Sequence, residues 1–143
     1  MKDLILHAAT INLGYAKLLV ADVPDAQLAS QPVTGKAMNH PAWVVGHIAR
    51  SLDVVSKLID SPADKPVDFK EVVARPGVTP SEWAELYGMK SQPMTDRSRY
   101  PAKDVLLKAL EDATAKASEV FRRATPAQLD RALGEPMNKR FPT

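Results

Sequence analysis

The chain has 143 residues, 45% of them hydrophobic, which is the usual size of one compact domain with a single core. Its 19 basic and 17 acidic residues give a formal net charge of +2 without a clustered basic face, so a nucleic-acid partner is not expected. There is no cysteine, which excludes disulfides, thiolate metal ligands and a cysteine nucleophile. The N-terminus resembles neither a signal peptide nor a membrane span, and we expect a cytoplasmic protein with no membrane partner.

Two long helices are predicted in the first part of the chain. The first runs from the N-terminus to about Asp22, and apolar residues at three-and-four spacing line one side of it. These are Leu4, Ala8, Ile11, Tyr15, Leu18 and Leu19. The second begins at Asn39 or His40, has Pro41 in its first turn, where a missing N–H costs nothing, and ends near Ser61. Its apolar face carries Val44, Ile48, Leu52, Val55 and Ile59.

A long proline-rich connection separates the second helix from a third, which follows Tyr100 and Pro101. Such a connection is typical of a crossover that packs on a bundle, and Met89, Met94 and Tyr100 are the residues expected to pack it. The inward face of the third helix is predicted to be Leu106, Leu110, Ala113, Ala117, Val120, Phe121 and Ala124. Lys108, Asp112 and Lys116 are spaced for exposed ion pairs.

Two short helices begin with capping-box patterns. One starts at Thr79, Pro80 and Glu82, and the other at Thr125, Pro126 and Gln128. Gly88 and Gly134 are the predicted stops of these helices. No segment alternates with a period of two for long enough to form a strand, so the fold class is all-α.

His47 lies on the apolar side of the second helix and is expected to point into the bundle or to its rim. A buried imidazole needs a hydrogen-bond partner or a metal, because an unsatisfied polar group costs about 1–3 kcal/mol. Spacing alone favours the hydrogen-bonding role. Gly46 is unfavourable inside a helix by about 1 kcal/mol relative to alanine, which indicates that a neighbouring group or ligand needs the space.

The other two histidines are not expected to bind the same ion. His40 precedes His47 by about 10 Å along the helix axis, too far for both to hold one metal, and it is predicted to be a cap or surface residue. His7 is predicted to be a packed or rim side chain.

Trp43 and Trp83 are predicted core anchors. A set of acids is predicted to be mostly outward and solvated: Asp53, Asp60, Asp104, Glu111, Asp112 and Glu119.

Three stretches, taken in order, resemble the DinB-like family of damage-inducible and related bacterial proteins: NHPAWVVGHIA, YGMKSQPMTDRSRYPAKDVLLKAL and ATPAQLDRALGEP. The resemblance covers most of residues 1 to 143. It implies a four-helix bundle with a long connection between helices two and three, often homodimeric, in which three histidines hold a divalent metal. One of those ligands comes from the second helix, so the resemblance implies that His47 binds zinc, nickel, iron or manganese.

The sequence departs from the family pattern near its end. The other two family histidines form an HxxxH pair on the last long helix, and this sequence stops at MNKRFPT without one. The chain is therefore a truncated piece of a longer protein, a protein that has lost the site, or one that completes the site with His7, His40 or another chain. We favour truncation: a single domain over residues 1–143 whose fourth helix is missing.

The resemblance leads to two hypotheses of function. The first is a metal-dependent enzyme related to thiol-dependent transferases, in which a small-molecule thiol is the partner and the crossover around Met89 to Tyr100 forms a lid or pocket wall. The alternative is a non-catalytic, stress-associated helical bundle that acts as a structural or dimerisation module.

Overall fold

The computed structural model describes residues 2–31, 33, 35–36, 38–62, 65, 67–68, 79–88 and 90–130. The helices are α1 (Lys2–Leu19), α2 (Pro41–Asp60), α3 (Pro80–Tyr87), α4 (Lys103–Arg123) and α5 (Pro126–Leu129), with 3-10 turns η1 (Asp25–Gln27) and η2 (Arg97–Arg99). These described residues include no strand, which confirms the all-α prediction. None of their helices is long and apolar enough to cross a bilayer.

The helix starts follow the local signals in the sequence. The side chain of His40 caps α2, and Pro41 occupies its first turn. Thr79 and Glu82 form a complete capping box at the start of α3, and Thr125 and Gln128 form another at α5. Gly88 ends α3 as predicted, whereas Gly134 lies outside the described residues.

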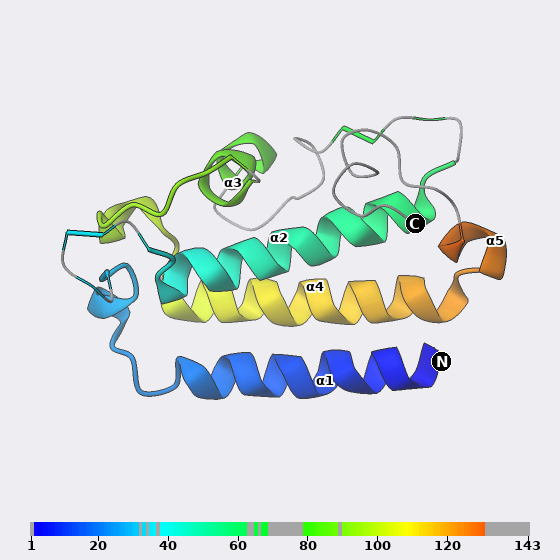
Figure 1. Ribbon diagram of the computed structural model, residues 1–143, viewed down its shortest axis with the longest axis horizontal. Helices are drawn as coiled ribbons and strands as arrows, with labels where there is room; N and C mark the ends of the chain where they lie inside the picture. The colour runs from blue at the N-terminus through cyan, green and yellow to red at the C-terminus, as the bar shows by residue number, and fades with distance from the viewer. Residues whose placement is uncertain are drawn as a thin grey trace.

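Three long helices lie side by side with α4 in the middle, and α3 lies on the far side of α2 (Figure 1). The centre of the core is the seam between α4 and α2. The side of α4 predicted to face inward is largely buried there, with Leu106, Leu110 and Ala113 almost fully enclosed. Small residues of α2, Ala42 and Ala49 among them, are fully buried in the same core. A fourth long helix is not found in the part of the chain that the structure describes.

The apolar face predicted for α1 turns away from the other helices. Leu4 is 72% exposed, Ile11 54% and Leu18 68%, while Leu13 and Ala16 pack against the core from the side that meets α4. The predicted face of α2 is likewise at the rim, where Ile48 and Val55 are exposed. Periodicity finds apolar faces, but both helices have apolar residues on more than one side, so it does not determine which side packs.

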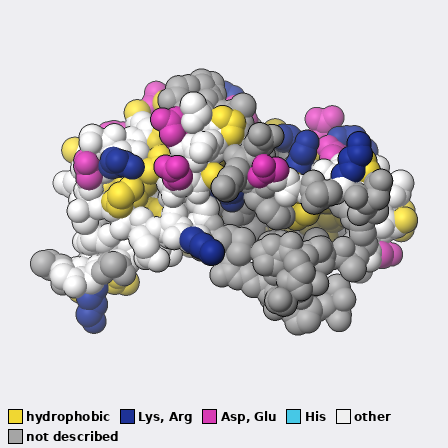
Figure 2. Space-filling model, turned by 90° about the horizontal axis from the view of Figure 1, so that it is seen from above, with side chains coloured by type: hydrophobic (Ala, Val, Ile, Leu, Met, Phe, Trp, Pro, Cys, Tyr) yellow, Lys and Arg dark blue, Asp and Glu magenta, His cyan; other side chains and the backbone are white. Residues whose placement is uncertain are grey.

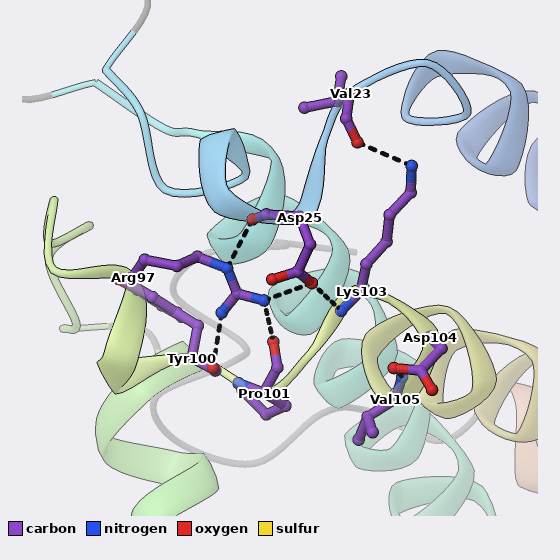
Figure 3. A network of polar contacts seen from close by, with 8 residues as sticks. All are labelled: Val23, Asp25, Arg97, Tyr100, Pro101, Lys103, Asp104 and Val105. Atoms are coloured by element: carbon purple, nitrogen blue, oxygen red, sulfur yellow. Dashed lines mark hydrogen bonds and ion pairs between the residues drawn. The ribbon is translucent and has the colours of Figure 1, made fainter.

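A polar junction connects the crossover to η1, in the loop that follows α1 (Figure 3). Asp25 accepts from the Arg97 guanidinium at 2.7 Å and from the Lys103 backbone N–H at 2.6 Å. Arg97 also donates to three carbonyl groups, those of Asp25, Tyr100 and Pro101. One side chain therefore joins η1, η2 and the approach to α4.

Candidate metal centre

His47 sits at the rim of the bundle on α2, half-buried, with its ring facing the end of α3. Its Nδ1 lies 2.8 Å from the backbone carbonyl oxygen of Tyr87. A carbonyl can only accept, so Nδ1 carries the proton and the neutral ring keeps its lone pair on Nε2. This is the arrangement in which a histidine binds a metal ion through Nε2 while its other nitrogen is held by a carbonyl.

The ring of His47 is also stacked on an aromatic neighbour. The indole of Trp43 lies one helical turn earlier on α2, with ring centroids 4.5 Å apart and planes 10° from parallel. Trp43 is half-buried and packs against the edge of the core, whereas Trp83 is the fully buried core anchor that was predicted. The two contacts restrain both the direction and the plane of the His47 ring.

Gly46 makes this approach of α3 possible. A Cβ at this position would lie 2.2 Å from Cε1 and 2.3 Å from Cζ of the Tyr87 ring, far inside van der Waals contact. The prediction that a neighbouring group needs the space beside Gly46 is confirmed, and that group is the tyrosine side chain. Because α3 can sit this close, its last carbonyl reaches His47.

Tyr87 also contributes a buried hydroxyl that sequence reasoning did not identify. Its side chain is fully buried, and among the described residues its Oη has no hydrogen-bond partner; the Nε1 of Trp83, one turn earlier, has none either. Burial raises the pKa of the Tyr87 hydroxyl, so it stays neutral and protonated. The sequence signal was available: two aromatic residues four apart on a short helix with a capping box.

His40 is a structural residue with no nitrogen to spare. Its Nδ1 accepts the backbone N–H of Trp43 at 3.2 Å, so its Nε2 carries the proton and donates to the Met94 carbonyl at 2.9 Å. Burial lowers the pKa of this imidazole. The predicted cap is confirmed, but the surface location is wrong, because the crossover at Met94 and Tyr100 covers the ring completely.

The described residues offer one candidate ligand and no complete metal site. His7 is exposed on α1, and no group of three or more His, Cys, Asp or Glu side chains is placed to hold an ion within these residues.

Asp53, predicted to be solvated, is instead 2% exposed, with the Lys116 ammonium of α4 at 3.6 Å. It faces the α2–α4 seam, which explains its burial. The predicted ion pair between Lys108 and Asp112 is present.

Charges on the face seen in Figure 2 are mixed, with acidic and basic side chains interspersed around apolar ones. Among the described side chains of that face, Lys and Arg are scattered and do not form a continuous area.

A family model described as the DinB superfamily matches residues 14–143. The match includes α2 with His47, the crossover and α4. Comparison with curated proteins and with solved structures gave no match.

Proposed function

The chain belongs to the DinB superfamily, and from that premise we propose that it contributes His47 to a divalent-metal site, with zinc, nickel, iron or manganese as the ion. The observation that carries the proposal is the bond from His47 Nδ1 to the Tyr87 carbonyl, which leaves the Nε2 lone pair available. A free Nε2 beside a restrained Nδ1 is the arrangement that a histidine ligand needs.

The described residues supply one ligand of such a site, His47. The remaining ligands would have to come from groups outside the described residues. His40 is fully engaged and His7 lies on α1, away from α3. A second protomer is one source of the remaining ligands. A divalent ion with an open position would supply Lewis acidity that lowers the pKa of a bound water or thiol, in keeping with a thiol-dependent transferase and a small-molecule thiol partner.

Metal content tests this proposal directly. The purified protein, His47→Ala and His7→Ala are each incubated with Zn²⁺, desalted and analysed by inductively coupled plasma mass spectrometry, with circular dichroism as the check on folding. We expect near-stoichiometric zinc in the wild type and in His7→Ala, and loss of zinc in His47→Ala. Equal zinc in all three folded proteins, or none in the wild type, would refute a site at His47.

A second candidate function, a non-catalytic dimerisation module, is supported by the exposed side of α1. Leu4, Ile11, Tyr15 and Leu18 recur along one side of this helix and are each more than half exposed. A continuous apolar stripe of this kind is typical of a surface that another helix covers. We propose that α1 packs against α1 of a second copy, because a two-fold axis brings the same stripe of both protomers together.

Oligomeric state tests the dimer. Light scattering after size exclusion is expected to show a dimer for the wild type and a monomer for Ile11→Glu combined with Leu18→Glu. The control is Thr10→Glu, an exposed polar residue of the same helix. A monomeric wild type would disprove the α1 interface. A dimer without bound zinc would favour the non-catalytic function over the metal site.

A further inference from the structure

The turn that follows α3 holds two aromatic rings on α2 at once. Trp43 and His47 lie four residues apart, so their side chains lie above one another on the same side of the helix. The Tyr87 carbonyl accepts from His47, and the Ser91 hydroxyl oxygen accepts from the indole Nε1–H of Trp43 at 3.0 Å. Both acceptors therefore come from residues 87 to 91.

Ser91 is itself fixed by the end of α3. Its hydroxyl donates to the Gly88 carbonyl at 2.8 Å, and its backbone N–H donates to the same oxygen at 3.0 Å. Gly88 in turn donates its N–H to Ala84 at 2.8 Å, which closes the last turn of α3. Because the one hydroxyl proton is used on Gly88, the oxygen lone pairs of Ser91 are left to face the indole.

The stacked indole of Trp43 restricts a rotation of the His47 ring that the hydrogen bond to Tyr87 still allows. An imidazole held only through Nδ1 can still swing about the N–H···O direction, and its Nε2 lone pair swings with it. A parallel ring at 4.5 Å blocks that motion only if the indole is itself held, and in this structure its Nε1–H is held by Ser91.

We propose that Ser91 and Trp43 are positioning residues for His47: they fix the plane of its ring so that the Nε2 lone pair points in a single direction. The expected effect of this positioning on metal affinity rests on the proposed function. The fixed ring plane and the Nδ1–H tautomer do not rest on it, because both can be measured in the protein without metal. This assigns a role to Ser91, which the sequence did not single out.

The experiment follows the His47 ring by long-range ¹H–¹⁵N NMR at a pH where imidazole is neutral. The variants are Ser91→Ala, which removes the hydroxyl, Ser91→Thr, which restores it, and Trp43→Leu, which removes the stacked ring. Ser98→Ala is the control, since that hydroxyl bonds Asp96 on an exposed turn away from α3. Zn²⁺ affinity is measured by calorimetry on the same proteins.

In the wild type we expect a protonated Nδ1, an unprotonated Nε2, and ring protons shifted upfield by the indole. Ser91→Ala and Trp43→Leu should reduce that shift and mix the two tautomers, while Ser91→Thr and Ser98→Ala should match the wild type. Zn²⁺ affinity should fall by about tenfold or more in Ser91→Ala, as for other residues that orient metal ligands.

Unchanged His47 spectra in Ser91→Ala would overturn the positioning role, and this arm remains decisive even if Trp43→Leu does not fold. Failure of the wild type to bind Zn²⁺ would count against the metal site alone. The spectra would then still decide whether Ser91 and Trp43 hold the ring.

Discussion

Gly46 and Tyr87 meet so closely that the backbone of α2 lies directly against an aromatic ring. The same contact brings the Tyr87 carbonyl to Nδ1 of His47, so the packing of one glycine and the orientation of the candidate ligand depend on each other. Another glycine, Gly14, sits inside α1 with nothing within 4 Å of the position of its missing Cβ. The two glycines provide a matched pair for testing how much of the site depends on this close approach.

Gly46→Ala is expected to lower the free energy of unfolding by about 1–3 kcal/mol, because the added methyl overlaps a fully buried ring that has no room to move. Gly14→Ala should raise it by up to about 1 kcal/mol, since alanine is the better helix former and meets no neighbour. Urea denaturation, at a concentration where the chain is monomeric, measures both. Stabilisation by Gly46→Ala would contradict the packing described here.

His40 makes stability depend on pH in the mildly acidic range. Burial lowers the pKa of its imidazole below the usual 6.5, so the unfolded chain binds a proton more readily than the folded one. The stability that the buried, neutral His40 ring contributes is therefore fully present above pH 6.5. It is lost as the pH falls through the lower pKa of the folded state. Arg97, the charged group that acts on this ring, shifts its pKa in the same direction.

We expect the wild type to lose stability below pH 6.5 and His40→Asn, which keeps a capping acceptor, to lose less over the same range. His7→Ala, a change at an exposed histidine, should follow the wild type. Thermal unfolding at a series of pH values makes the comparison. A His40→Asn curve parallel to that of the wild type would show that His40 is not the titrating group.

At the scale of elements, α3 is a short helix with a large structural role. It has only 8 residues, yet it buries Trp83, Leu86 and Tyr87. Its last residue holds the ring of His47, and the turn that follows it holds the ring of Trp43 through Ser91. So short a helix is marginal by itself, and its first turn depends on the capping box of Thr79 and Glu82.

Thr79→Ala should therefore lower stability by about 1 kcal/mol, the usual loss for an N-cap, whereas Thr79→Ser should retain the bond and most of the stability. Amide hydrogen exchange should show faster opening of α3 in the alanine variant than of α4. Equal protection of α3 in both variants would mean that packing on α2, and not the cap, determines whether this helix forms.

At the scale of the whole molecule, the Asp25–Arg97 junction decides how the crossover meets the bundle. Arg97 binds carbonyl groups on two segments that are distant in the chain, and Asp25 accepts from both Arg97 and Lys103 (Figure 3). These bonds lower the pKa of the Asp25 carboxyl. The junction anchors the crossover near η2, from where it continues to the His40 ring through Met94 and Tyr100.

Arg97→Lys is expected to lower the free energy of unfolding by about 2 kcal/mol, because an ammonium cannot match the several directions in which the guanidinium donates. Arg99→Lys, at an exposed position of the same turn, should stay within about 0.5 kcal/mol of the wild type. Chemical denaturation of both proteins tests this. Equal effects of the two changes would argue against the junction as the anchor of the crossover.

Much of this architecture is local and could be read from the sequence. Pro41, the two capping boxes and Gly88 set the starts and stops of helices because their effects operate within one turn, and the apolar spacing of α4 correctly predicted its buried side. His47 was singled out as a candidate ligand, and Gly46 as a point of close approach, since both are unusual in an apolar helix.

Only the tertiary structure decided which groups meet. Segments that are far apart in the chain bury His40 and Asp53 and bring Ser91 to Trp43. The packing of the helices likewise leaves the apolar stripe of α1 exposed. Periodicity describes how apolar residues are arranged around a single helix, whereas burial depends on which neighbour packs there. The sequence by itself therefore determined the helices and the candidate histidine. Packing between α2, α3 and the crossover determined the ring's orientation, because hydrogen bonds from distant segments hold it.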